Sequence, residues 1–112
     1  MVYLKSRSQL LKGVLEGCIL AIMKQEPTYG YGLSVKLHDY GLTNISEGSI
    51  YPILLRLQKE KLIVGEMKDS PAGPKRKYYQ LTEAGKEALI KFTQNWETIK
   101  HPVDQILRGE TQ

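Results

Sequence analysis

A run of three consecutive cations, Lys75, Arg76 and Lys77, follows shortly after Gly73 in the sequence. A glycine has no side chain to hold other groups away, so this segment could approach a phosphate backbone or a nucleic-acid groove closely. The same cations could instead keep an exposed strand edge soluble. The elements around the run decide between these two interpretations.

Hydroxyl groups and a guanidinium occur along an apolar periodic segment that extends from about residue 50 to residue 62. Ser49 and Tyr51 lie near its start, and Arg56 lies further along. If this segment is a helix, it fits the major groove of DNA, and its N-terminal amides can meet phosphate oxygens. The hydroxyls can then donate to phosphates or base edges, and the donor fork of Arg56 can contact phosphate or guanine.

No catalytic or metal-binding constellation is found in the sequence. His38 and His101 are far apart and have no companions at metal-ligand spacing, so we expect surface or helix-end roles for them. Cys18 lies in an apolar stripe, where a buried and inert thiol is the usual case. No glycine-rich phosphate loop with a following lysine occurs. The sequence therefore predicts no enzyme, no metal site and no cofactor.

Length and charge narrow the class of protein. The chain has 112 residues, 41% hydrophobic and 25% charged, as in an ordinary globular protein of one domain. Its formal charge is +4, and residues 1–82 carry twelve basic and seven acidic side chains, against four and five in residues 83–112. Such a distribution suits a polyanion-binding head joined to an interaction element. The apolar run 10–23 contains Lys12 and Glu16 and no cleavage site, so we expect no membrane anchor, no export and a cytoplasmic location.

Helical periodicity marks the first part of the chain. Apolar residues recur three and four positions apart between residues 11 and 22, which predicts a helix that ends before Pro27. A short second helix is expected from about residue 31 to Tyr40, with Gly41 as its C-terminal stop.

The third helix has two possible starts. With Ser46 as the N-cap, Pro52 lies beyond the first turn and removes a helical hydrogen bond; with Ser49 as the N-cap, Pro52 falls where proline is tolerated. Segments 63–67 and 77–81 can then form two strands, joined by a long basic tip over residues 68–76.

The last helix is predicted to begin at Thr82, whose hydroxyl can cap it. Its apolar positions are spaced alternately three and four apart, as in the a/d seam of a coiled coil: Leu89, Phe92, Trp96, Ile99, Val103 and Ile106. Such a seam needs a partner helix, so we expect it to form a homodimer. Because Pro102 interrupts the seam, a kink or break is expected near His101.

The order of three helices, a hairpin and a final helix predicts a mostly α (α+β) fold, a winged helix-turn-helix with a long C-terminal dimerisation helix. Residues 1–82 would form the DNA-binding domain, and residues 83–112 the dimerisation helix. A two-fold dimer would match a palindromic site on double-stranded DNA with half-sites about 34 Å apart.

Three motifs, in this order, resemble the PadR family of bacterial transcriptional regulators. They are residues 29–33 (YGYGL), 48–57 (GSIYPILLRL) and 73–85 (GPKRKYYQLTEAG), followed by one long C-terminal helix typical of the shorter subgroup. The resemblance spans about residues 10–107. It implies a dimeric repressor whose winged-helix domains bind inverted-repeat operator DNA.

The resemblance also implies which residues contact DNA. It places Ser49, Tyr51, Pro52, Lys75 and Arg76 on the recognition-helix and wing motifs, and it matches Tyr31 to an aromatic position near the DNA backbone. With the residues argued above, the predicted DNA-binding set is Tyr31, Ser49, Tyr51, Pro52, Arg56, Gly73, Lys75, Arg76 and Lys77.

The short subgroup includes multidrug-sensing repressors with a cavity at the dimer centre, and Trp96 resembles the aromatic platform of such a cavity. A tryptophan across a two-fold axis offers two stacking faces to a small planar or cationic effector. The expected lining is Trp96, Phe92, Ile99, Leu15 and Ile19. Ordinary dimer packing of the same residues is the competing interpretation.

A winged helix can also act as a protein-interaction module, with its basic wing on an acidic partner and no operator. The cationic run and the hydroxyl-bearing start of the third helix occur together, which favours DNA.

Overall fold

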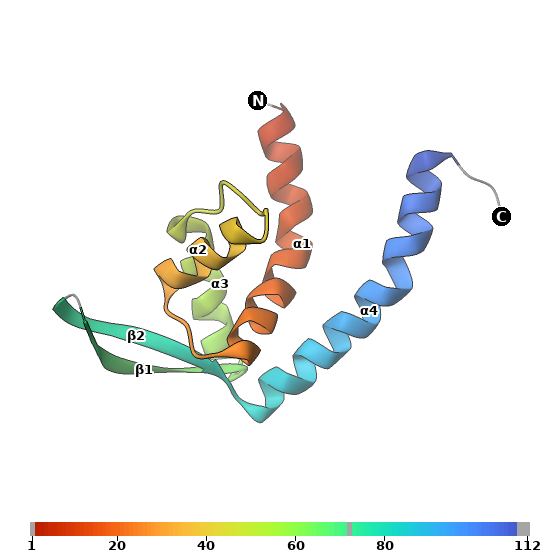
Figure 1. Cartoon of the computed structure of the whole chain (residues 1–112). Helices are drawn as coiled ribbons and strands as arrows, with labels where there is room; N and C mark the ends of the chain where they lie inside the picture. Colours follow the sequence, from red (N-terminus) through yellow and green to blue (C-terminus); the bar gives the residue numbers. More distant parts are fainter. Residues whose placement is uncertain (1, 72, 110–112) are drawn as a thin grey trace.

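The protein is described here by a computed structural model that covers residues 2–71 and 73–109 (Figure 1). Its elements are, in chain order, α1 (Val2–Gln25), α2 (Gly30–Asp39), α3 (Glu47–Lys59), β1 (Ile63–Ser70), β2 (Gly73–Leu81) and α4 (Glu83–Arg108). Figure 1 shows α2 and α3 beside α1, the β1–β2 hairpin extending to one side, and α4 leaving from the base of the hairpin. This arrangement confirms the predicted mostly helical winged helix-turn-helix fold, and we call the hairpin the wing.

The first two helices end where the sequence predicts. α1 ends at Gln25, before Pro27, although it begins well before the apolar stripe does. α2 ends at Asp39 with Tyr40 as its C-cap. Gly41 follows with a φ of 105°, a left-handed conformation that glycine adopts without strain.

Of the two predicted starts of α3, the structure has the earlier one. Ser46 is the N-cap, and its Oγ accepts a hydrogen bond of 3.3 Å from the amide of Ser49. Pro52 therefore lies inside the helix, where it has no N–H to donate to the carbonyl of Gly48. Gly48 is exposed, so water can take the place of the missing bond.

The wing has longer strands than the sequence predicts. The two strands pair antiparallel as far as Lys68 opposite Arg76, and again at Ser70 opposite Gly73. The prediction of a long basic tip over residues 68–76 is therefore wrong, because most of that segment is paired strand. Gly73 has a φ of 142°, which permits a turn tight enough for the pairing to continue past Lys68.

Main-chain hydrogen bonds tie the wing to the helices. The amide of Thr28 donates to the carbonyl of Tyr79 at 3.0 Å, and the amide of Tyr79 donates to the carbonyl of Thr28 at 2.9 Å. Thr28 lies between α1 and α2, while Tyr79 lies on β2. These bonds hold the base of the wing next to the N-terminus of α2.

The core is formed by apolar side chains from all four helices and both strands. Its buried members are Leu15, Ile19, Leu20, Ile22, Met23, Leu33, Leu37, Ile50, Leu54, Leu57, Ile63, Tyr79 and Leu89. Burial of this surface is the main stabilising contribution to the fold. It fixes the relative positions of α2, α3 and the wing, which carry the predicted DNA-binding residues.

The start of α4 is as predicted. Thr82 is the N-cap, and its Oγ1 accepts from the amide of Gly85 at 3.1 Å while donating to the carbonyl of Lys61 at 2.8 Å. A Cβ at Gly85 would lie 2.0 Å from the carbonyl oxygen of Leu62, so only glycine allows this close approach. The helix is thereby seated directly on the segment that precedes the wing.

The far end of α4 bends without breaking. The helix continues through Pro102 to Arg108, so the alternative of a break near His101 is wrong. Figure 1 shows α4 changing direction in its C-terminal third, which agrees with a kink at the proline.

Candidate nucleic-acid interface

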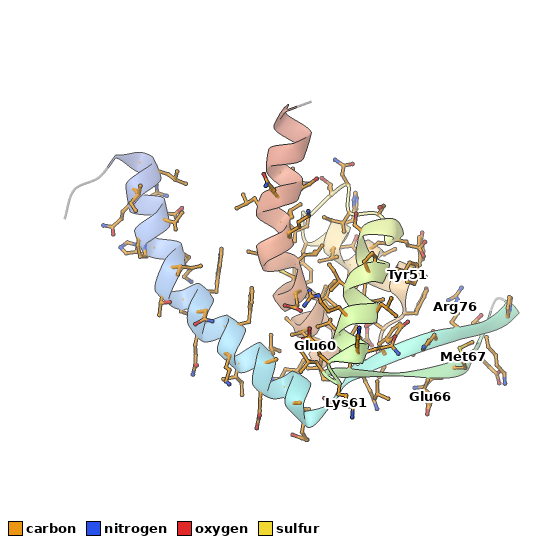
Figure 2. The ribbon with its side chains drawn as sticks, turned by 180° about the vertical axis from the view of Figure 1, so that it is seen from behind. Tyr51, Glu60, Lys61, Glu66, Met67 and Arg76 are labelled. Atoms are coloured by element: carbon orange, nitrogen blue, oxygen red, sulfur yellow. The ribbon has the colours of Figure 1, made fainter. Side chains whose placement is uncertain are left out.

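The N-terminus of α2, one flank of α3 and strand β2 meet on one side of the molecule. A cavity of about 390 Å³ lies between them, lined by Tyr29, Gly30, Tyr31, Tyr51, Lys75, Arg76, Lys77 and Tyr79. The structure thus brings together the predicted residues Tyr31, Tyr51, Lys75, Arg76 and Lys77. Figure 2 shows Tyr51 on α3 and Arg76 on β2 on the same side of the molecule. Cations and phenolic hydroxyls at one place are suited to phosphate oxygens.

Tyr51 is held in place by a glycine and a carboxylate. A Cβ at Gly30 would lie 2.9 Å from the Tyr51 hydroxyl oxygen, so the glycine leaves room for the ring against α2. The Tyr51 hydroxyl donates to Glu47 Oε2 at 3.1 Å. Burial, and then the hydrogen bond to Glu47, raise the pKa of Tyr51. The phenol is therefore neutral at physiological pH and fixed in orientation.

Aromatic rings position the cations of the wing. The guanidinium of Arg76 lies 4.5 Å from the ring centre of Tyr29, and the Tyr29 ring lies 5.2 Å from that of Tyr78. Lys77 Nζ lies 5.7 Å from the ring centre of Tyr79. Such contacts hold a cation without neutralising its charge. Sequence reasoning missed Tyr29, although it belongs to the YGYGL motif.

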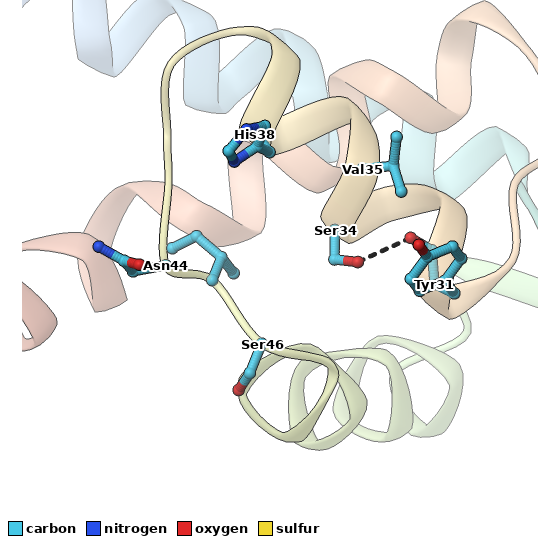
Figure 3. Close-up of a pocket in the computed structure, with 7 residues that line it drawn as sticks. Tyr31, Ser34, Val35, His38, Asn44 and Ser46 are labelled. Atoms are coloured by element: carbon cyan, nitrogen blue, oxygen red, sulfur yellow. Dashed lines mark hydrogen bonds between the residues drawn. The ribbon is translucent and has the colours of Figure 1, made fainter.

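A second cavity continues this surface along α2 (Figure 3). It has a volume of about 580 Å³ and is lined by Tyr31, Ser34, Val35, His38, Asn44, Ile45 and Ser46. Ser34 Oγ donates to the carbonyl of Tyr31 at 2.7 Å, and Asn44 adopts a left-handed φ of 66°. Because Tyr31 lines both cavities, the hollowed surface runs from the wing to the α2–α3 connection. Ser34 and Asn44 carry no sequence signal beyond their place in the helix-turn-helix.

Three predicted residues lie on the other flank of α3. Ser49, Pro52 and Arg56 line a depression that they share with the N-terminal half of α1. The guanidinium of Arg56 lies 2.6 Å from Glu16 Oε1 and 3.8 Å from Glu60 Oε2. Its Nη1 is therefore directed toward carboxylates of the same chain, while the side chain is half-exposed. Contact of Arg56 with phosphate or guanine stays a prediction.

Gly73 lies at the outer end of the wing. It is exposed, and a Cβ built on it would meet no described heavy atom within 4 Å. Within the described structure, the turn requires a positive φ at this position, which explains why the residue is a glycine. Close approach to a ligand at this point stays a prediction.

The predicted seam of α4 divides into two parts. Leu89 is buried in the core, and the ring of Phe92 packs on Gly17 of α1. Further along the same face, the exposed residues are Trp96, Ile99, Val103 and Ile106. The first part of the seam therefore makes contacts within the chain, and the second part is open to solvent in a single copy.

Two residues expected to line an effector cavity belong to the core. The relative exposures of Leu15 and Ile19 are 4% and 0%. Both lie inside the hydrophobic cluster, because the apolar stripe of α1 is wide enough to pack on its own chain. In a single copy their side chains are almost fully covered, and their place in an effector lining at a dimer centre stays a prediction.

Two negative findings apply to the residues that the structure describes. Among them, no three or more His, Cys, Asp or Glu side chains gather closely enough to hold a metal ion. None of the helices in residues 2–71 and 73–109 has the length and apolar character needed to cross a bilayer.

The chain is similar to solved bacterial regulators over nearly its whole length. A PadR-like transcriptional regulator from Bacillus cereus is 59% identical, with a TM-score of 0.81, and the match covers 91% of this chain and 99% of that one. A Streptococcus transcriptional regulator is 45% identical, with a TM-score of 0.79, over 88% of this chain and 96% of that one.

Sequence comparison agrees with the structural similarity. A Lysinibacillus sphaericus protein named only "Uncharacterized protein X" is 30% identical over 105 residues, which cover 92% of this chain and 96% of that protein. Residues 19–91 match the transcriptional regulator PadR-like family, and this segment contains α2, α3 and the wing. The chain therefore belongs to the PadR-like family of transcriptional regulators.

Proposed function

We propose that this protein is a transcriptional repressor that binds an inverted-repeat DNA operator as a homodimer. The observation that carries the proposal is the meeting of α2, α3 and the wing around one cavity, which Lys75, Arg76 and Lys77 line together with tyrosine side chains. Membership of the family supports a regulatory role on DNA. The proposal further includes a cytoplasmic location and no catalytic activity.

In the proposed complex, the N-terminal part of α3 enters the major groove. The N-terminus of α2, with Tyr31, lies along one phosphate backbone, because its first amides have no capping side chain. The cations of the wing contact flanking phosphates or the adjacent minor groove. Residues 1–82 act as the DNA-binding head in this arrangement.

Dimerisation is assigned to residues 83–112 through the outer half of α4. Ile99, Val103 and Ile106 are exposed in one line, on the face that packs against the core earlier in the helix. An apolar stripe of this kind is stabilised by a second helix. A two-fold dimer would present two heads to two half-sites.

Release by a small aromatic or cationic molecule is the most specific part of the proposal. Trp96 is 42% exposed and lies where the buried and open parts of the seam meet. With Leu15 and Ile19 in the core, any effector would contact Trp96 and Ile99, together with the same residues of the second copy. A flat indole face suits planar and cationic compounds.

Fluorescence anisotropy tests the proposal directly. Purified protein is titrated into a labelled duplex from the region upstream of its own gene and into a scrambled duplex, at equal salt. Binding well above the scrambled control supports an operator, and release by an added aromatic cation supports an effector. Equal, weak binding to both duplexes that modest salt abolishes would favour the alternative, a winged helix that binds an acidic protein.

A further inference from the structure

The outward face of α3 carries no side chain able to form hydrogen bonds through its first two and a half turns. The buried face of the helix is formed by Ile50, Leu54 and Leu57. At 100° per residue, the positions opposite these three are Gly48, Pro52 and Leu55. Leu55 is 70% exposed on this face.

Two hydrogen-bonding side chains on the flanks of α3, Tyr51 and Arg56, have partners within the chain, while the amide of Gln58 faces the groove beside β2. The Tyr51 hydroxyl donates to Glu47 on the wing side. Arg56 is paired with Glu16 on the α1 side. These contacts engage the Tyr51 hydroxyl and Nη1 of Arg56 at the flanks of the line through Gly48, Pro52 and Leu55.

The polar residues that remain lie at the two ends of the helix. Ser49 Oγ lies 3.4 Å from the N-cap hydroxyl of Ser46 in the first turn. Lys59 follows Leu55 on the outward face one turn later, in the last turn, where a cation suits phosphate. The middle of the outward face is therefore apolar.

An open groove beside this face has a mostly apolar α3 wall, in which Tyr51 and Gln58 carry the polar groups. It runs between α3 and β2 and is lined by Gly48, Tyr51, Pro52, Leu54, Leu55, Gln58, Lys77 and Tyr79. Its cationic group, Lys77, comes from the wing rather than from α3. The wing therefore supplies the cation of this groove, and α3 supplies its apolar wall.

The major groove offers one apolar group to such a surface. Guanine, cytosine and adenine present hydrogen-bonding atoms there, whereas thymine adds a C5-methyl group. We infer that α3 recognises thymine through this methyl group, with Leu55 and Pro52 as the specificity-determining residues. The inference rests on the proposed function, because it requires α3 to enter the major groove of an operator.

The experiment replaces thymine by deoxyuracil, which removes the methyl group and leaves the base-pairing edge unchanged. A preferred duplex is first obtained by selection from a random library with the full-length protein. Each thymine of a half-site is then replaced in turn, and the Kd is measured by fluorescence anisotropy for the wild type and for Leu55→Ala. We expect at least one replacement to raise the wild-type Kd about fourfold, as removal of one buried methyl group predicts.

Matched variants separate this contact from general effects on folding or assembly. Leu55→Ala should bind the thymine and deoxyuracil duplexes equally at that position, while Leu55→Met, which keeps an apolar side chain, should still discriminate. Leu10→Ala removes an equally exposed leucine from α1 and should discriminate like the wild type. Circular dichroism melting checks that each variant is folded.

The experiment gives different results if only the thymine inference fails and if the proposed function fails as well. If the protein selects a sequence but no deoxyuracil replacement changes its Kd, or if Leu55→Ala still discriminates, thymine recognition by Leu55 is overturned and the operator stands. If selection enriches no sequence, both are overturned.

Discussion

The ring of Phe92 lies where a side chain at Gly17 would have to be. A Cβ built on Gly17 would be 2.3 Å from Phe92 Cδ1, so the ring packs directly on the backbone of α1. This contact joins the first half of α4 to α1, at the point where α4 leaves the core. Gly17 is thus a packing residue, although glycine is unfavourable in a helix interior.

Replacement of Gly17 by alanine should destabilise the protein. The methyl group would overlap the Phe92 ring, and overpacking of this kind costs about 1–3 kcal/mol. Gly13, in the same helix, is the matched control, because a Cβ there meets no described atom within 4 Å. Gly13→Ala should raise the free energy of unfolding by up to about 1 kcal/mol. Urea denaturation of both variants measures the difference, and equal effects would contradict the packing role.

The exposed half of the α4 seam should control assembly. Two aspartates, in Ile99→Asp with Val103→Asp, would place charge in an apolar helix interface, which is strongly unfavourable. We expect this variant to sediment as a monomer. The control is Ile90→Asp, because Ile90 is exposed on a different face of the same helix. A dimer that persists in the double variant would refute dimerisation through this seam.

Trp96 should contribute to ligand binding without contributing to DNA binding. With rhodamine 6G as a planar cationic probe, Trp96→Ala is expected to weaken binding about two- to tenfold, the value of an aromatic or cation–π interaction. Trp96→Phe should retain much of the affinity, and the operator Kd should change little in either variant. Isothermal titration calorimetry suits the probe and anisotropy suits the DNA. An equal reduction of both affinities would mean that Trp96 acts through packing alone.

The two arginines of the predicted interface should differ in their response to salt. Arg76 stacks on Tyr29 and forms no salt bridge with an acidic side chain of residues 2–71 or 73–109, whereas Arg56 is paired with Glu16. Arg76→Ala should therefore lower the slope of log K against log salt by about 0.9 for each phosphate that the arginine neutralises. Arg56→Ala should leave this slope nearly unchanged and lower stability by less than about 1 kcal/mol. Equal slopes for the two variants would remove Arg76 from the residues that bind phosphate.

Tyr51 should ionise at a higher pH than an ordinary tyrosine. Burial and the hydrogen bond to Glu47 raise its pKa, so the folded state favours the protonated phenol. The resulting stabilisation is complete below the ordinary pKa of about 10 and is lost as the pH rises through the raised value. Absorbance titration at alkaline pH, compared with Tyr51→Phe, isolates this transition. Ionisation of Tyr51 at or below the ordinary pKa would contradict both the burial of the phenol and its hydrogen bond to Glu47 in solution.

Local sequence patterns predict where the helices of this protein begin and end better than they predict which residues the helices contact. The helix boundaries near Pro27 and Gly41 and the Thr82 cap follow from residue conformation alone. The spacing of α4, in contrast, reports which positions are apolar but not which chain covers them. It therefore groups Leu89 and Phe92, which pack within the chain, with residues that lie exposed.

In the predicted interface, too, the sequence shows which residues are charged or aromatic but does not show which residues they contact. Lys75, Arg76 and Lys77 stand out in the sequence as a charge run, and they do lie beside Tyr31. The role of Tyr29 could not be predicted, because its partner Arg76 is distant in the sequence. Likewise, the direction of Arg56 depends on Glu16, a contact that only the packing of α3 on α1 creates.

The bridge between Thr28 and Tyr79 is made entirely by main-chain atoms. Most substitutions at the surface of α3 or the wing therefore leave intact the bonds that hold the wing to the α1–α2 connection. In such an architecture, exposed side chains can be substituted while the arrangement of the backbone stays the same. Gene duplication followed by replacement of a few exposed residues, Leu55 among them, would be enough to direct a descendant of this protein to a different DNA sequence.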